Sequence, residues 1–588
     1  MYSRQHIVAA ARGDEQMDVV IREVNLVNVF TAEIYQADIG IKEERFAAIA
    51  RYENDVPAFQ MDGEKEIRAK GKYAVPGFID CHVHIESTMI PPDMFARAVL
   101  RHGTTVAVID PHEIGNVLGA EGVKYMVEAS KGLPVRILTT IPSSVPAVPG
   151  VETAGAEFHP EDIAELLRLP DVVGVAELMD YVGVIKQNPR MAGIVQKGLD
   201  AGVLNEGHLP RVSGRPLQAY LAAGVNSDHE SRTEAEILEK LRAGMLIYIR
   251  ESSVSQFADI AAKAWETVPY SSNIAMCTDD IEPNDMLKNG QMNRVVRRAI
   301  EEGIPAPLAI RYATLNGAIR YGLRDRGAIA AGYLADFSLV NSLETMQVHD
   351  VFVQGKRMVK DGNVAVDITS SIPPLLKNTV QLPPLKEEDF IIQAPQDNGT
   401  VTLNSIEMTP IGTTEKGTLE LEISNGKITA LPDDYVFASV VGRHGQSRKP
   451  FVGVLKNAGL KSGAYATTVA HDSHNLVVVG TNACDMLLAA EQLQKAGGGL
   501  CLIEDGQVMA QVDLPVAGLM APEPIEELSP KVDQFNEVAR SMGVKVGRRS
   551  PSMALSSLTL TVIPAIRISD LGLVDVNTQQ LIPLFVED

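Results

Sequence analysis

The sequence predicts an α/β protein in which a TIM-like (β/α)₈ barrel lies between a small β-sandwich domain and a C-terminal α+β domain. An apolar strand, a polar loop and an amphipathic helix follow one another repeatedly from residue 74 to residue 328, which is typical of a parallel sheet with crossover helices. Short strand-like runs flank this region, and a proline-rich stretch separates it from the last part of the chain. A chain of 588 residues is long enough for several domains.

The small β domain is expected to combine residues 1–73 with residues 329–370. Strand-like runs at Asp18–Glu23 and Phe46–Ala50 are separated by turn-forming residues. The same pattern of strand-like runs and turn-forming residues occurs between residues 332 and 362, where two apolar runs are joined by a turn that contains glycine. We therefore expect both segments to form one β-sandwich beside the barrel.

The barrel is expected to span residues 74–328. Its fifth and sixth strands are short and have weak strand propensity, and they are placed partly because closure of a barrel requires them. Amphipathic helices are expected between the strands, for example over Asn116–Lys131, Thr233–Ala243 and Met292–Glu302. The eight expected strands are Ala74–Cys81, Thr104–Ile109, Val135–Ile141, Val172–Ala176, Val203–Gly207, Gly224–Ser227, Met245–Arg250 and Asn273–Thr278.

The C-terminal domain is expected to follow a linker. Residues 371–385 are rich in proline and show no periodicity, which is typical of a linker. Residues 386–588 mix alternating runs, such as Thr418–Ile423 and Leu476–Val479, with a helical stretch at Asp485–Lys495. This mixture predicts an α+β fold.

The composition argues against several classes of partner. The 75 acidic residues outnumber the 53 basic ones, and the net charge of −22 disfavours binding to nucleic acid or an anionic membrane. The four cysteines are far apart, so neither disulfides nor a thiolate metal site is indicated. The N-terminus is charged, and no apolar run reaches the length of about 18 residues that a membrane span needs. We expect a cytoplasmic protein with a small, neutral substrate.

Polar side chains follow five of the expected strands at the point where each strand ends. His82 and His84 come at the end of the first strand, two residues apart, so their side chains point to the same side. The other residues of this kind are Glu177 at the fourth strand, His208 at the fifth, His229 at the sixth and Asp279 at the eighth. Because catalytic groups in such barrels lie at the carboxyl ends of the strands, we expect all six side chains to meet in one pocket.

This set of imidazoles and carboxylates suits two divalent metal ions. A single histidine is more often structural than a ligand, but six groups exceed what one catalytic ion usually binds. We expect His82, His84 and Asp279 on one ion, His208 and His229 on the other, and Glu177 between them. Two cations would generate a hydroxide nucleophile at neutral pH, and Asp279 is best placed to take and return its proton.

Several segments carry a resemblance to a known family. The run Pro76–His84 resembles the first-strand motif of the amidohydrolase superfamily of metal-dependent hydrolases. Within that superfamily the chain is similar to the bacterial adenine deaminase family over nearly its whole length. The segments that carry this similarity are His84–Thr88, Val108–Gly119, Gly174–Ile185, Ile249–Ser253, Cys277–Asp280, Thr468–Gly480 and Gly497–Cys501.

The resemblance implies a function that composition does not. It implies hydrolysis of adenine to hypoxanthine and ammonia in purine salvage, with Mn²⁺ or Fe²⁺ as the metal, Zn²⁺ as an alternative, and a homodimer. Many superfamily members carry a carboxylated lysine where this chain has Glu177, and glutamate at that position is what the adenine deaminase family shows. In the implied mechanism the metal-activated hydroxide attacks C6 of the purine, an acid protonates ring N1, and Asp279 shuttles protons to the leaving group.

The acid that protonates N1 is expected to be Glu113, in the loop after the second strand, where desolvation could raise its pKa. The alternative is that the carboxylates of Asp110 and Glu113 cap a helix that begins near Asn116.

Five further residues are candidates for substrate binding or a lid. His112 lies in the same loop as Glu113, and His471 and His474 form a cluster that could be a lid, a structural loop or a further metal site. Arg250 and Glu251 follow the seventh strand and could orient ligands or form an ion pair.

Two other functions remain possible at this stage. One is hydrolysis of a different cyclic amide or amidine on the same scaffold. The other is a barrel that has lost catalysis and serves as a scaffold, which the presence of all six candidate ligands argues against.

Overall fold

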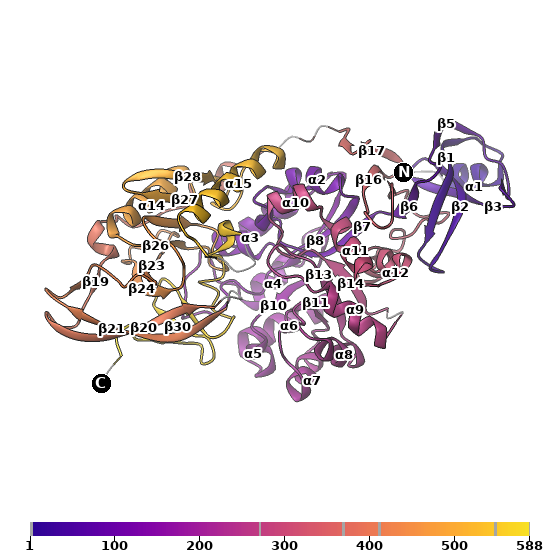
Figure 1. Ribbon diagram of the computed structural model, residues 1–588. Coiled ribbons are helices and arrows are strands. Elements are labelled where there is room, and N and C mark those ends of the chain that lie inside the picture. Colours follow the sequence, from indigo (N-terminus) through magenta and orange to yellow (C-terminus); the bar gives the residue numbers. More distant parts are fainter. Residues whose placement is uncertain are drawn as a thin grey trace.

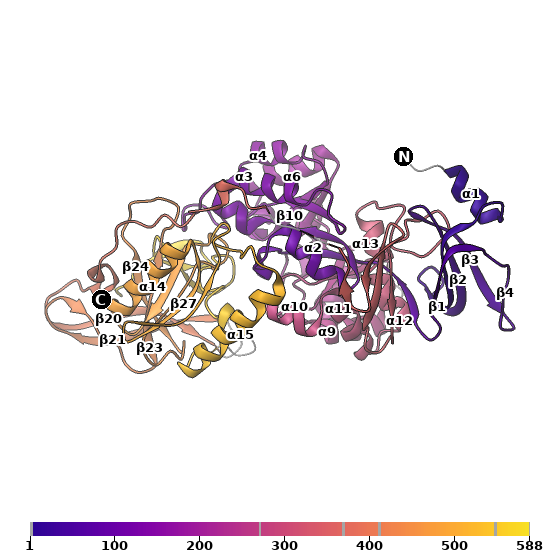
Figure 2. The same cartoon turned by 90° about the horizontal axis from the view of Figure 1, so that it is seen from above.

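The computed structural model describes residues 4–269, 272–366, 368, 371–409, 413–545 and 550–586. Residue 370, at the expected end of the small β domain, lies outside the described residues, as do residues 1 and 588 at the outer limits of the chain. A sheet near the N-terminus, a central region of parallel strands and helices, and a C-terminal α+β region lie side by side in that order (Figures 1 and 2).

Ten strands from both sides of the central region form one sheet. Its order is β18-β17-β16-β15-β6-β1-β2-β3-β4, and β5 pairs with β1. The antiparallel pair of β6 and β15 joins the N-terminal segment to the segment that follows the central region. The strands are β1 (Met17–Asn28), β2 (Glu33–Lys42), β3 (Arg45–Glu53), β4 (Val56–Pro57), β5 (Gly63–Arg68), β6 (Tyr73–Pro76), β15 (Phe337–Val340), β16 (Val348–Val353), β17 (Lys356–Lys360) and β18 (Asn363–Val364).

Alternating side chains give this sheet an apolar core on each face. Val20 packs on one face with Ile7 of helix α1 (Arg4–Arg12), and Ile21 packs on the other. On that second face the rings of Phe46 and Phe337 lie 5.5 Å apart, although three strands separate β3 from β15. The sheet therefore curls over on itself.

The central region contains a curled parallel sheet, as the sequence pattern predicts. The first five strands form one sheet and the last three another. A parallel bridge between Val83 and Asp279 links the outer edges, and the Gly207 N–H donates to Ser227 Oγ (2.9 Å) at the other junction. The strands are β7 (Phe78–Val83), β8 (Thr104–Ile109), β9 (Arg136–Ile141), β10 (Val172–Leu178), β11 (Leu204–Gly207), β12 (Ser227–Asp228), β13 (Leu246–Arg250) and β14 (Ile274–Cys277).

Two of these strands differ from the prediction by more than two residues at one end. The expected first strand is divided at Gly77, because the residues before it pair with β15 and those after it pair with β8. A Cβ at Gly77 would lie 2.3 Å from Thr105 Oγ1, so only glycine lets the chain pass there. The sixth strand is two residues long and starts later than expected, because Gly224 adopts a φ of 101° in the preceding turn.

Helices follow the strands of the central region. Helix α3 begins at His112, earlier than the expected Asn116, so Glu113 lies in its first turn and not in a loop. The helices are α2 (Pro92–Leu100), α3 (His112–Ala129), α4 (Pro160–Leu166), α5 (Tyr181–Ile185), α6 (Pro189–Ala201), α7 (Gly214–Ala222), α8 (Glu234–Arg242), α9 (Ala258–Thr267), α10 (Pro283–Asn289), α11 (Met292–Glu301), α12 (Ala306–Tyr312) and α13 (Leu315–Arg320), with a 3₁₀ turn η1 (Glu86–Thr88) after β7.

An eight-stranded mixed sheet forms the centre of the C-terminal region, in the order β21-β20-β24-β23-β26-β25-β27-β28. Helix α14 packs on one face through Met486 and Leu493, and α15 packs on the other through Phe535. The elements are η2 (Pro374–Leu376), η3 (Glu387–Phe390), β19 (Ile392–Gln393), β20 (Gly399–Met408), β21 (Thr414–Ile423), β22 (Lys427–Ile428), β23 (Tyr435–Val441), β24 (Phe451–Lys456), β25 (Ala464–Thr467), β26 (Leu476–Gly480), α14 (Ala483–Ala496), β27 (Gly499–Glu504), β28 (Gln507–Asp513), α15 (Ile525–Ser541), η4 (Pro551–Met553), β29 (Ile566–Ile568), β30 (Leu573–Asp575) and β31 (Gln580–Ile582).

Helix α15 also contacts the central region. Glu526 pairs with Arg97 (2.6 Å) and Arg101 of the α2 segment, and Asp533 pairs with Lys288 of α10 (2.7 Å). These pairs join helix α15 to two helices of the central region. Among the described residues, none of the helices has the length and apolar character that a membrane span needs.

Candidate metal centre and active site

The six side chains expected at the strand ends lie together. Each is at most 8% exposed, and each lies in or directly after a parallel strand. The residues are His82 and His84 at β7, Glu177 in β10, His208 after β11, His229 after β12 and Asp279 after β14.

Asp279 faces the two histidines of β7. Its Oδ1 lies 3.5 Å from His82 Nε2 and 3.1 Å from His84 Nε2. The Asp279 N–H donates to the His82 carbonyl (2.9 Å), which fixes the backbone beside β7. Asp279 has a left-handed φ of 57°, which is unfavourable for a residue other than glycine, so the surrounding structure imposes this conformation.

Glu177 lies between two groups of imidazoles. Its Oε1 is 3.5 Å from His84 Nε2, whereas its Oε2 is 2.7 Å from His208 Nδ1 and 3.1 Å from His229 Nε2. One carboxylate thus offers a different oxygen to each group. This is the arrangement that a ligand bridging two cations needs.

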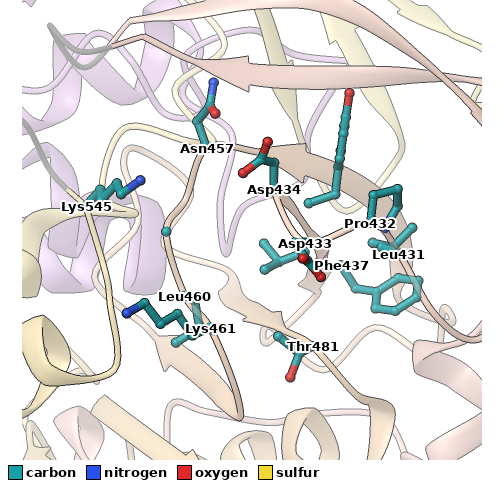
Figure 3. A pocket seen from close by; sticks show the side chains of 13 residues that line it. Leu431, Pro432, Asp433, Asp434, Phe437, Asn457, Leu460, Lys461, Thr481 and Lys545 are labelled. Carbon is teal, nitrogen blue, oxygen red and sulfur yellow. The ribbon is translucent and has the colours of Figure 1, made fainter.

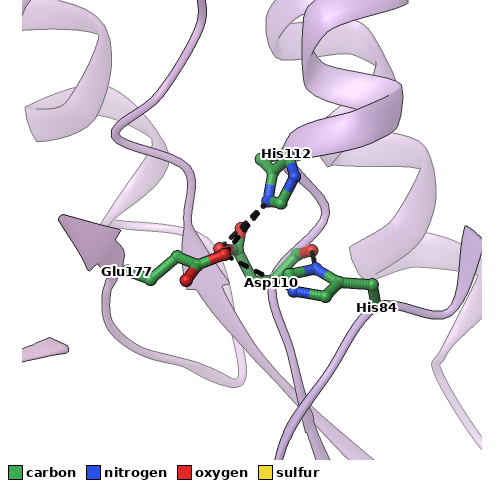
Figure 4. A group of neighbouring side chains, drawn as sticks. All are labelled: His84, Asp110, His112 and Glu177. Carbon is green, nitrogen blue, oxygen red and sulfur yellow. Dashed lines mark hydrogen bonds and ion pairs between the residues drawn. The ribbon is translucent and has the colours of Figure 1, made fainter. Parts of the chain in front are cut away.

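His84, Asp110, His112 and Glu177 form a connected group (Figure 4). His84 Nδ1 lies 3.0 Å from the Asp110 carbonyl, which can only accept, so Nδ1 carries the proton and Nε2 presents its lone pair to the centre. His112 Nδ1 lies 3.3 Å from Asp110 Oδ2 and 3.8 Å from Glu177 Oε1. His112 therefore belongs to the edge of the same cluster.

Both carboxylates of the centre are ionised. Burial alone would raise the pKa of Glu177, but His208 and His229 hold that pKa well below its usual range. Burial opposes ionisation of Asp279 too, but Arg250, His82 and His84 keep its pKa well below normal.

The donor set fits divalent metal ions. Ligand atoms of His82, His84 and Asp279 lie within 4.8 Å of one another, as do those of His82, Glu177 and His229. His82 Nε2 is buried and has no hydrogen-bond partner among the described residues. A buried imidazole nitrogen without a hydrogen-bond partner, facing ionised carboxylates, fits the role of a metal ligand.

Arg250 positions Asp279 from the other side. Its Nη1 bonds Asp279 Oδ2 and also lies 2.6 Å from Glu230 Oε1. Burial opposes ionisation of Glu230, but Arg250 lowers its pKa to about 2. Asp279 therefore directs one oxygen to the histidines and the other to the guanidinium group of Arg250.

A cavity of about 90 Å³ opens onto this cluster. The C-terminal region supplies part of its wall, so the centre is not complete on the parallel strands alone. Its lining residues from the C-terminal region are His471, Asp472, Ser556, Ser557, Leu560 and Ile563. Those from the central region are His84, His112, Glu177, Met179, His208, His229, Glu230, Arg232, Arg250, Val254, Ser255, Asp279 and Asp280.

Glu113 lies behind this wall and is not among the lining residues. The Ser87 hydroxyl lies 3.0 Å from its Oε1, and His471 Nδ1 lies 3.6 Å away. Burial, with Glu86 beside it, raises the pKa of Glu113 well above its usual range. In the first turn of helix α3 the Ile114 N–H donates to Glu86 Oε1 (3.2 Å), and among the described residues no cap bond to the carboxylate of Asp110 or Glu113 is found, so the structure gives no support to the capping alternative.

Two other candidates also lie outside the cavity. Glu251 Oε1 accepts a hydrogen bond from the Ala258 N–H (2.8 Å) at the start of helix α9. His474 is buried in its own loop, where Nδ1 accepts a hydrogen bond from the Ala470 N–H (3.2 Å). By contrast, His112, Arg250 and His471 line the cavity.

Four acidic residues of the site are absent from the sequence-based candidate set. Three of them could have been found from their position, because each follows a strand and lies within two residues of a candidate. These are Asp110, Glu230 and Asp280. Asp472 lies 3.4 Å from His112 Nε2, and it reaches the site only through docking of the C-terminal region.

A larger cavity, of about 460 Å³, lies in the C-terminal region (Figure 3). Asp433, Asp434, Lys461 and Lys545 are among its lining residues, and no histidine is. It therefore lacks the donor set found at the strand ends.

Comparison with known proteins agrees with the site. The amidohydrolase family model matches residues 73–358, and the adenine deaminase C-terminal domain model matches residues 412–580.

Curated relatives match over nearly the whole chain. An adenine deaminase of Klebsiella pneumoniae subsp. pneumoniae is 40% identical over 98% of this chain and 95% of its own. One from Dehalococcoides mccartyi is 39% identical over 98% of both chains, and one from Desulfatibacillum aliphaticivorans is 38% identical over 98% of this chain and 99% of its own. The chain belongs to the adenine deaminase family of the amidohydrolases.

Proposed function

We propose that the protein hydrolyses adenine to hypoxanthine and ammonia at the buried centre on the parallel strands. The observation that carries this proposal is the set of four imidazoles and two carboxylates gathered at the strand ends, five of which line one cavity, in a chain 40% identical to an adenine deaminase over nearly its full length. The proposed architecture is a (β/α)₈ barrel over residues 74–328, a β-sandwich of residues 1–73 and 329–370, a linker over residues 371–385, and an α+β domain over residues 386–588.

Two divalent ions, Mn²⁺ or Fe²⁺ by preference and Zn²⁺ as an alternative, are proposed to bind the six side chains. His82, His84 and Asp279 would hold one ion, and His208 and His229 the other. Glu177 would bridge them, because its two oxygens face different imidazoles. Bound there, the cations would lower the pKa of water enough to supply the nucleophile at neutral pH.

Asp279 is proposed to move protons. It is buried and ionised, so it can accept a proton from the attacking water and return it to the leaving amino group. Its bond to Arg250 keeps the carboxylate directed at the cavity through both transfers.

Glu113 is proposed to supply the proton to ring N1 through its neighbours. Its raised pKa keeps a proton available near neutral pH. Ser87 Oγ lies within hydrogen-bonding distance of both Glu113 Oε1 (3.0 Å) and Asp280 Oδ1 (2.7 Å). Because Asp280 and His471 line the cavity, either can connect Glu113 to the substrate.

The remaining candidates have narrower proposed roles. His112 and His471 would contact the substrate or close the cavity, with His474 supporting the loop of His471. Glu251 would support the segment of Arg250. Family membership also supports a homodimer, a cytoplasmic location and a role in purine salvage.

The test is the loss of adenine absorbance with release of ammonia by Mn²⁺-loaded protein, measured beside adenosine, cytosine, guanine and a dihydropyrimidine. We expect turnover of adenine alone. Turnover of the dihydropyrimidine without adenine would favour a cyclic-amide hydrolase, and no turnover with no bound metal would favour a scaffold.

A further inference from the structure

One buried lysine ties together the two loops that carry His208 and His229. Lys240, on helix α8, is fully buried, and its ammonium group has four oxygen neighbours. These are the carbonyl of Leu209 (2.5 Å), Glu236 Oε1 (2.7 Å), Asp228 Oδ2 (2.9 Å) and Ser231 Oγ (3.1 Å). Leu209 follows His208 directly, and Asp228 precedes His229.

The two carboxylates beside Lys240 hold the same loops by their backbones. Asp228 Oδ1 accepts from the N–H of Leu209 (2.8 Å), and Glu236 Oε1 accepts from that of Arg211 (2.8 Å), both in the loop after β11. In the loop after β12, Asp228 Oδ1 accepts from the Glu230 N–H (3.2 Å) and Glu236 Oε2 from the Arg232 N–H (2.9 Å).

Such a buried ionic group needs a reason beyond stability. Removing an ammonium and two carboxylates from water is costly, and apolar side chains of similar size often stabilise a core as well or better. What the ionic group adds is a fixed position of the two loops relative to each other, since each carboxylate accepts hydrogen bonds from both loops. We call Lys240, Asp228 and Glu236 the α8 clasp.

We propose that the α8 clasp positions His208 and His229 and thereby sets the affinity of the second metal ion. The proposal rests on the metal centre described under the proposed function. Among the described residues, the clasp makes no hydrogen bond or ion pair with His82, His84 or Asp279. Asp110 positions His84 instead, and Arg250 positions Asp279. Its loss should therefore affect one ion much more than the other.

The test is the metal content and Mn²⁺ affinity of Lys240→Met, measured by elemental analysis and by titration of metal-free protein. We expect one tightly bound ion per chain in place of two, and a dissociation constant for the second ion raised about 10–100-fold, the usual effect of losing a group that orients metal ligands. Turnover should recover as Mn²⁺ is raised. Lys263→Met, at an exposed position on neighbouring α9, is the matched control and should bind both ions like the parent.

The outcomes separate the proposals. Two ions bound to Lys240→Met with the affinity of the parent would overturn the role of the clasp, even if the melting temperature falls. A parent protein that binds no metal would instead overturn the metal centre itself. If Lys240→Met does not fold, Glu236→Gln replaces it, because the amide keeps the shape but loses the charge and one of the two acceptor oxygens that hold the loops. Weaker binding of one ion by that variant supports the clasp, and unchanged binding of both overturns it.

Discussion

Glu152 should make the attachment of the C-terminal region depend on pH. This carboxyl is 3% exposed, and its Oε1 accepts hydrogen bonds from the Val148 N–H (2.9 Å) and from the Thr561 hydroxyl (2.7 Å), which belongs to the C-terminal region. Burial raises the pKa of Glu152 from 4.5 to about 8, against these two bonds and with help from the charges of Asp472 and Asp570.

The direction and size of the pH effect follow from the difference between the pKa of Glu152 in the folded protein and in the unfolded chain. Below pH 4.5 the carboxyl is protonated in both the folded and the unfolded states, so its contribution to the free energy of unfolding is at its maximum and no longer changes with pH. Between pH 4.5 and about 8 the carboxyl is ionised in the unfolded chain but still protonated in the folded protein. The free energy of unfolding therefore falls by about 1.4 kcal/mol for each pH unit in this range. The free energy of unfolding should therefore fall by at most ~5 kcal/mol over this range through Glu152 alone.

Glu152→Gln should remove this dependence, because an amide oxygen can accept the same two hydrogen bonds and carries no charge. We expect the variant to match the parent near pH 5 and to melt at a higher temperature at pH 8. Thermal unfolding of both proteins from pH 5 to 9 checks this, with exposed Glu157→Gln in the same segment as control. A difference between variant and parent that does not grow with pH would refute the reasoning.

Three further predictions concern the proposed centre. His82→Ala or His84→Ala should abolish turnover and lower the metal content with the fold intact; circular dichroism and elemental analysis check this, and full metal with more than a few per cent of parental activity would contradict it. Asp279→Asn should lower kcat by about three orders of magnitude or more, so turnover within about tenfold of the parent would assign proton transfer to another residue. Glu113→Gln should lower kcat by roughly 10²–10⁴ with unchanged metal content, and an unchanged kcat would make Glu113 structural.

Much of the centre was predictable because strand periodicity is local. The pattern that identifies β7 also identifies which side His82 and His84 share, and the ends of β10 and β14 follow from similar runs, whereas β11 and β12 are placed partly because a barrel must close. Placement of polar residues at carboxyl ends then brings the candidates together. For β7, β10 and β14 that inference needs no distant contact.

The rest depends on packing that a single sequence does not display. Asp472 lies between the candidates His471 and His474, but it meets His112 only because the C-terminal region docks on the strand ends, and the sequence does not show that contact. Lys240 lies on an amphipathic helix, where a lysine normally indicates an exposed face, and its pairing with Asp228 and Glu236 compensates for its burial. Gly77 divides the first strand because the chain passes close to Thr105.

The most direct test of the central claim is a titration of metal-free protein with Mn²⁺ while adenine consumption and ammonia release are followed together. The account predicts no turnover without metal and a rise that reaches its maximum at two ions per chain, with one ammonia released for each adenine consumed. Absence of adenine turnover in folded protein that has bound two ions would contradict it.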